Sequence, residues 1–207
     1  GYEADIVGFP ADGQQSQNLL VERAGTGSGV LILGAHLDSV ADSPGMNDNA
    51  TGVVALLSIA RALIRLPAPI LTVRFAFWGA EEGGPFGSAA YVASLDADAR
   101  AEIRAYINAD MIGSPNGITF VYDEPGAAPG SDAITNVISG YFRLRGRPWE
   151  PIDLAGDSDH GRRDAGDTKS RIRLGPAELR SGRRIDGRGL GLRLFERRHL
   201  DGRGPHL

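Results

Sequence analysis

Short apolar runs alternate with helix-forming segments between residues 29 and 142, and this alternation constrains the fold more than any other feature. Apolar runs predict buried strands at 29–33, 70–78, 105–109 and 117–122. Helical patterns, some with a capping Ser or a following Pro, predict helices at 53–66, 87–95 and 131–142. Strands that alternate with helices predict an α/β fold, a three-layer sandwich in which helices flank a mixed, mainly parallel sheet.

Composition excludes several classes of protein. The 207 residues suit one α/β domain. The chain has no Cys, which excludes disulfide scaffolds, thiolate zinc fingers, iron–sulfur clusters and cysteine nucleophiles. No apolar run approaches the roughly 18–20 residues that a membrane-spanning helix needs. The chain starts with Gly1 rather than Met, so we expect that any signal peptide has been removed or lies outside it.

Four polar segments lie at the ends of predicted strands or before a predicted helix. They are 34–40 (GAHLDSV), 45–52 (GMNDNATG), 78–84 (WGAEEGG) and 108–113 (NADMIG). Each alone has an ordinary explanation: a hydrogen-bonded His, an Asx turn, an exposed Glu pair or a helix-capping Asp. Together they would meet at the carboxyl ends of parallel strands, where the repulsion between carboxylates requires a cation. Because the donors are imidazole and hard oxygens, zinc is the first expectation, followed by manganese or cobalt.

The order of these motifs resembles that of a known enzyme family. The chain is similar to secreted bacterial leucyl-type aminopeptidases with two zinc ions in its motifs His-x-Asp, Asn-Asp-Asn-x-x-Gly, Glu-Glu and Asn-x-Asp-Met-x-Gly, and in Ser158-Asp159-His160. These enzymes belong to the MH clan of zinc exopeptidases, with glutamate carboxypeptidase and glutaminyl cyclase relatives. The resemblance runs from about Asp5 to His160. It implies a secreted hydrolase that uses zinc to release N-terminal residues from peptides with a free N-terminus.

The resemblance also implies which residues hold the metal. Four residues are the implied zinc ligands: His36, Asp48, Glu82 and Asp110. His36 and Asp110 would bind one ion, Glu82 would bind the other, and Asp48 would bridge the two.

Two further residues receive catalytic roles from the resemblance. Glu81 takes the position of the general base, and Asp38 that of the carboxylate that orients the His36 imidazole. A hydroxide shared by two zinc ions has its pKa lowered towards about 7. Glu81 would accept the water proton and pass it to the leaving amine.

Charge divides the chain into two parts. Residues 1–160 contain 9 Arg and 20 acidic residues, a balance of −11, which agrees with a cationic substrate group such as an α-amino group. Residues 161–207 contain 13 basic and 6 acidic residues, a balance of +7, and 9 of the 29 Gly. A basic tail can bind nucleic acid, but this one has a single aromatic residue, Phe195, and lacks stacking surfaces. We therefore expect no nucleic-acid or membrane partner.

The end of the chain departs from the family pattern, which divides it into an incomplete catalytic domain at 1–166 and an Arg/Gly-rich tail at 167–207. The family has a late zinc-binding His in a Tyr-His-x-x-x-Asp context, and neither His199 nor His206 has that context. Gly156-Asp157 stands where the family often has Gly-Arg. The first residues resemble a strand that normally follows an opening helix.

A frameshift would explain the tail. The family continues with Ala-Gly-Ile-Pro, whereas this chain reads Gly166-Asp167-Thr168. The codons GGG GAT ACC encode Gly-Asp-Thr, and loss of one G would give Gly-Ile-Pro. We expect the chain as written to fold poorly, to bind fewer than two zinc ions and to have little activity. The open alternatives are a genuine divergent tail, an inactive or partly metallated domain, and a carboxypeptidase or cyclase on the same scaffold.

Overall fold

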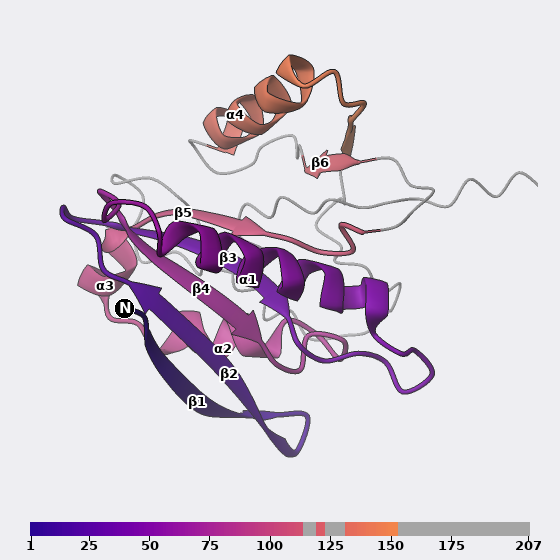
Figure 1. The fold of residues 1–207 in the computed structure, drawn as a ribbon. Coiled ribbons are helices and arrows are strands. Elements are labelled where there is room, and N and C mark those ends of the chain that lie inside the picture. The colour runs from indigo at the N-terminus through magenta and orange to yellow at the C-terminus, as the bar shows by residue number, and fades with distance from the viewer. Residues whose placement is uncertain (114–118, 123–130, 153–207) are drawn as a thin grey trace, which may run out of the picture.

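The structure of the chain is a computed structural model, which describes residues 1–113, 119–122 and 131–152 (Figure 1). The strands are β1 (Glu3–Ala11), β2 (Gln14–Arg23), β3 (Val30–His36), β4 (Thr72–Trp78), β5 (Ile103–Asn108), β6 (Phe120–Tyr122) and β7 (Glu150–Ile152). The helices are α1 (Thr51–Leu63), α2 (Phe86–Ser94), α3 (Ala97–Glu102) and α4 (Ser131–Leu144). A short π-helical turn, η1 (Met46–Ala50), precedes α1.

Five strands form a mixed sheet in the order β1-β2-β4-β3-β5. β3 lies between β4 and β5 and runs parallel to both. β1 and β2 form an antiparallel hairpin, and β2 also pairs antiparallel with β4. β6 and β7 form a separate parallel pair. A mixed sheet with helices on its two faces confirms the predicted α/β sandwich.

The sheet separates two hydrophobic cores. On one face, Phe75 and Phe77 of β4 pack in a cluster with Leu56 of α1. On the other face, Trp78 of β4 packs against Tyr91 of α2, with ring centroids 5.4 Å apart. Successive side chains of a strand point to opposite faces, so one strand supplies both cores. Figure 1 shows α1 and α2 on opposite sides of the sheet. Each helix contributes buried apolar side chains to the core on its own side.

The elements predicted from apolar patterns are present, with shifted ends. β3 continues to His36, three residues beyond the predicted strand. α1 ends at Leu63 rather than Leu66, because the amides of Arg65 and Leu66 bond to carbonyls three residues back. The Arg23 guanidinium also donates to the carbonyl oxygens of Leu63 and Leu66, which satisfies the end of the helix. β2, α3 and β7 have no counterpart among the predicted elements.

Two sequence predictions fall partly or wholly outside the described residues. The predicted domain boundary at 166 and the tail at 167–207 lie there, as does the Ser158-Asp159-His160 motif. Within the described ranges, no helix has both the length and the apolar character needed to cross a membrane.

Candidate metal centre

The three parallel strands end at the same edge of the sheet, and the predicted site residues follow them there. His36 is the last residue of β3, and its partner in the parallel ladder is Trp78, the last residue of β4. Gly34 of β3 pairs with Asn108, the last residue of β5. The carboxyl ends of parallel strands are where α/β proteins place their ligands. The loops that leave these ends carry every carboxylate of the candidate site.

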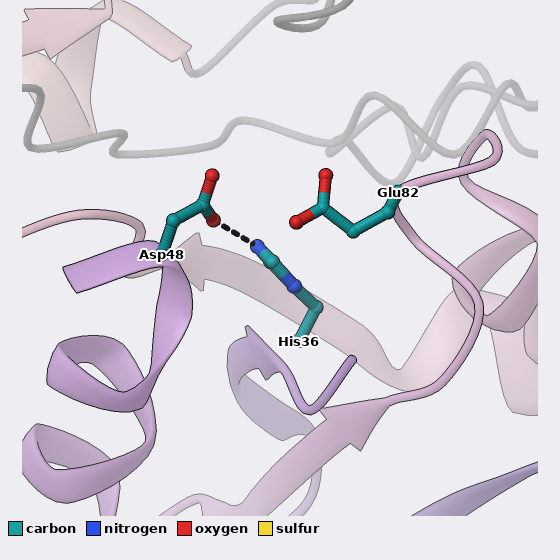
Figure 2. A group of neighbouring side chains, drawn as sticks. All are labelled: His36, Asp48 and Glu82. Atoms are coloured by element: carbon teal, nitrogen blue, oxygen red, sulfur yellow. Dashed lines mark ion pairs between the residues drawn. The ribbon is translucent and has the colours of Figure 1, made fainter. Parts of the chain in front are cut away.

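His36, Asp48 and Glu82 form the centre of the site. One ligand atom from each residue lies within 4.8 Å of the other two, and no further group of this kind occurs in the part of the chain that the structure describes. The His36 imidazole is 2% exposed, and its Nε2 lies 2.9 Å from Asp48 Oδ1. Figure 2 shows the Asp48 and Glu82 carboxylates converging on the imidazole from opposite sides. This is a compact set of one nitrogen and two carboxylate donors.

Asp110 lies beside this group. It follows β5, is 2% exposed, and its Oδ1 is 3.4 Å from His36 Nε2. The resemblance pairs His36 with Asp110 at one ion and places Glu82 at the other. In the structure, Asp48 and Asp110 both lie next to His36 Nε2, at 2.9 and 3.4 Å, and the donors within 4.8 Å of one another are those of His36, Asp48 and Glu82.

Asp38 contacts both His36 and the β4–α2 loop, defined as residues 79–85. Its main-chain oxygen accepts a hydrogen bond from His36 Nδ1 at 3.0 Å, while its carboxylate oxygen is 3.8 Å from that nitrogen. The carboxylate instead accepts hydrogen bonds from the amides of Glu81 and Glu82, both at 2.9 Å. The imidazole is thus oriented mainly by the main chain of Asp38, because a carbonyl can only accept and so fixes the proton on Nδ1. Nε2 is left facing the carboxylates.

Glu81 lies at the border of the site. Its Oε2 is 3.9 Å from His36 Nε2, and its side chain is 14% exposed. It does not belong to the three-residue group, whereas its neighbour Glu82 does. Of the two adjacent glutamates, Glu82 therefore belongs to the group with His36 and Asp48, and Glu81 lies next to that group.

The carboxylates favour a positive charge at the centre of the site. Burial opposes protonation of His36, but hydrogen bonds to Asp110 and Asp48, together with the charges of Asp110 and Glu81, outweigh it and raise the pKa of His36 to about 11. A divalent cation satisfies the same field, since it takes the place of the proton on Nε2. His and carboxylate donors in this proportion suit zinc. The residues present therefore fit a zinc ion.

Asn49 belongs to the site, but the sequence does not predict its role, because Asn-Asp-Asn is also an ordinary turn sequence. It is 2% exposed, and its Oδ1 accepts hydrogen bonds from the amides of Gly52 and Met111. Its Nδ2 donates to the carbonyl oxygen of Ala109. One side chain therefore holds the start of α1 against the residues on both sides of Asp110.

Three residues that bear on the predicted site lie outside the described residues. They are His199 and His206, the candidates for a late zinc ligand, and Asp157. The six residues predicted as ligands or catalytic groups are all described.

Comparisons with known proteins identify the family. The model of "Peptidase family M28" matches residues 18–164, more than half of the chain. An aminopeptidase of Pseudomonas aeruginosa is 44% identical over 153 residues, which cover 70% of this chain and 28% of that protein. The probable lipoprotein aminopeptidase LpqL of Mycobacterium tuberculosis is 39% identical over 158 residues, 70% of this chain and 32% of that protein.

A solved structure is also similar. BSAP, a zinc aminopeptidase from Bacillus subtilis, matches with a TM-score of 0.61 and 27% identity, over 69% of this chain and 36% of that one. This chain thus spans about a third or less of the length of the two curated relatives. The match to the family model nevertheless includes every residue of the candidate metal centre. The chain belongs to peptidase family M28, a family of peptide hydrolases.

Proposed function

We propose that the protein is a zinc-dependent aminopeptidase, which hydrolyses the first peptide bond of peptides with a free N-terminus. The observation that carries this proposal is the group of His36, Asp48 and Glu82 donor atoms, all within 4.8 Å of one another at the edge of the sheet. The names of the aminopeptidase relatives and of the zinc-containing structure support it.

The metal ligands follow from the positions of the side chains. In this proposal His36, Asp48 and Glu82 hold one zinc ion, because they form the compact group. Asp48, whose side chain is 33% exposed, would also be shared with a second ion, which Asp110 would help to hold. The resemblance implies a different partition, in which His36 and Asp110 share one ion and Glu82 binds the other. Bound zinc supplies Lewis-acid polarisation of a carbonyl and lowers the pKa of water.

Glu81 is the proposed proton acceptor. It lies close enough to the donors to reach a molecule held there, with Oε2 3.9 Å from His36 Nε2, yet it is not one of the three grouped residues. Its backbone amide is fixed by the Asp38 carboxylate, which limits the directions in which its side chain can extend. In the proposed reaction the Glu81 carboxylate takes a proton from water and gives it to the leaving amine.

The proposed substrate is a peptide with a free, cationic α-amino group. Five carboxylates gather around His36 in this region: Asp38, Asp48, Glu81, Glu82 and Asp110. A cluster of negative charge attracts cationic groups and repels a free C-terminal carboxylate. This favours cleavage from the N-terminus over cleavage from the C-terminus. A location outside the cytoplasm is part of the proposal, supported by the name of the lipoprotein relative.

Two chromogenic substrates test the proposal. Purified protein is incubated with zinc and leucine p-nitroanilide, and in parallel with N-acetyl-leucine p-nitroanilide. We expect slow, zinc-dependent release of nitroaniline from the first substrate alone, because the sequence predicts little activity for the chain as written. A chelator should abolish this release, and added zinc should restore it. Equal cleavage of the blocked substrate would contradict an aminopeptidase.

A further inference from the structure

Asn18 in β2 connects the two ends of the β4–α2 loop. Its side-chain Oδ1 accepts a hydrogen bond from the amide of Gly79, the first residue after β4, at 3.1 Å. Its Nδ2 donates to the carbonyl oxygen of Gly87, the second residue of α2, at 2.8 Å. Asn18 is 2% exposed, so neither bond is replaced by water. The residues between these two ends include Glu81 and Glu82.

The ends of this loop are in direct contact, and glycine is required at both. A Cβ on Gly87 would lie 2.5 Å from Asn18 Oδ1 and 2.5 Å from the carbonyl oxygen of Gly79. A Cβ on Gly79 would lie 2.3 Å from the carbonyl oxygen of Gln17 in β2. These atoms are backbone or tightly held side chain, so they cannot move aside. The loop therefore leaves and rejoins the fold at one narrow point, with Asn18 inside it.

We propose that Asn18 is a positioning residue, which sets the place of Glu81 and Glu82 relative to His36 by closing the base of the β4–α2 loop. This inference rests on the proposed zinc site. Asn18 is remote in sequence from every residue of that site. It acts through the loop rather than on the metal or the substrate.

Hydrogen bonds hold the loop at two places, at its base and near the two glutamates, and Asn18 provides those at the base. At its base, Asn18 fixes Gly79 and Gly87. Further along, the Asp38 carboxylate fixes the amides of Glu81 and Glu82. Without the Asn18 side chain, two buried backbone groups lose their partners, which lowers the cost of opening the loop. The Asp38 contacts alone would then have to hold both glutamates.

Three variants of the full chain separate positioning from a general role in stability. Asn18→Ala removes both hydrogen bonds, and Asn18→Ser leaves a neutral hydroxyl that can still bond to one of the two backbone groups. Tyr91→Phe is the matched control, because it removes a partly buried hydrogen bond from Arg74 on the same side of the sheet. No hydrogen bond of the Tyr91 side chain involves the loop.

Two measurements are made on each variant. The first is amide hydrogen exchange of residues 79–87 in zinc-free protein, compared with exchange of β3. We expect Asn18→Ala to accelerate exchange of the loop amides by at least about tenfold, as loss of a net hydrogen bond does, with a smaller effect in Asn18→Ser. The second is zinc affinity by competition with a chelator. We expect a loss of about 10–100-fold in Asn18→Ala, the range for outer partners of a metal site, and no change in Tyr91→Phe.

Each outcome decides the inference. Loop exchange at the wild-type rate in both Asn18 variants would overturn it, as would the same acceleration in Tyr91→Phe. Faster exchange with unchanged zinc affinity would show that Asn18 closes the loop without positioning Glu82, and would also overturn it. If Asn18→Ala does not fold, Asn18→Ser decides the result. A wild-type chain that binds no zinc would contradict the proposed function, while the exchange data would still test the closure of the loop.

Discussion

The parallel and antiparallel halves of the sheet differ in what they carry. β3, β4 and β5 run parallel, and the last residue of β3 together with the loops after the three strands supplies all six predicted site residues. The hairpin of β1 and β2 supplies none of these six, and most of β1 is exposed to solvent. The parallel half buries apolar side chains on both faces, as Phe75 and Trp78 show.

This difference reflects what each half must do. Adjacent parallel strands bring the starts of several loops to one edge, where charged side chains can converge. The hairpin extends the sheet and supports it, through contacts such as Glu22 of β2 with Arg74 of β4. If this division is correct, substitutions at the parallel edge change zinc binding or catalysis, and substitutions in the hairpin change stability. Asn18 is the proposed exception, since it reaches the β4–α2 loop.

The largest expected effect is at Glu81. Glu81→Gln should lower turnover about 10²–10⁴-fold, the usual contribution of a general base, because the amide cannot accept the proton. The zinc content should stay unchanged, since Glu81 is outside the three-residue group. Steady-state kinetics and elemental analysis of the same preparation measure both quantities. Loss of zinc together with activity would show that Glu81 is a ligand.

The next largest effect is on metal binding at Asp48. Asp48→Ala should lower zinc affinity by more than about 100-fold, beyond the loss typical of an outer partner, because the proposal gives this carboxylate to two ions. Asp42→Ala is the control, since Asp42 is an exposed carboxylate in the same connection between β3 and α1. Elemental analysis after dialysis gives the answer. Zinc bound as tightly in Asp48→Ala as in the wild type would exclude Asp48 as a ligand.

A smaller effect, on stability alone, is expected in the hairpin. The Arg74 guanidinium donates to Glu22, and its Nη2 lies 2.5 Å from Glu22 Oε2. Glu22→Gln should lower the free energy of unfolding by about 1–2 kcal/mol, the scale of a hydrogen bond to a charged group at a partly exposed site. Zinc affinity should not change. Denaturant unfolding and zinc titration of the same variant test this. A large loss of zinc affinity would contradict the claim that substitutions in the hairpin change stability alone.

The smallest effect is expected on the outer strand. Ile6 in β1 is 65% exposed. Ile6→Thr should therefore change the free energy of unfolding by less than about 0.5 kcal/mol and leave zinc affinity unchanged. A loss of several kcal/mol in denaturant unfolding would show that β1 is covered by another part of the protein.

The same division explains how far the sequence predicts the fold. The strands of the parallel half are apolar on both faces, so β3, β4 and β5 are visible as apolar runs. β1 exposes residues 3–8 in succession, which leaves neither an apolar run nor a regular alternation. The hairpin does have one local signal, Asp12-Gly13, whose φ angles of 44° and 75° belong to a tight hairpin turn. That signal predicts that β2 pairs with the strand before it, but it does not predict that β2 also pairs with β4.

The site was predictable to a similar extent. Its ligands could be named because they follow strands in short motifs, and the structure brings His36, Asp48 and Glu82 together. Which ligands share the same zinc ion was not predictable, because this depends on where the loops lie in space. Asn18 could not be found either, since its partners are about 60 residues away and become neighbours only when β2 pairs with β4.

Zinc titration of the chain with two single variants tests the central claim most directly. The claim is that His36, Asp48 and Glu82 hold one zinc ion, with Asp110 outside that group. We expect one tightly bound zinc per wild-type chain, loss of that ion in His36→Ala, and its retention in Asp110→Ala. Retention in His36→Ala, or equal loss in both variants, would contradict the three-residue site. Two tightly bound ions in the wild type would contradict a single complete site.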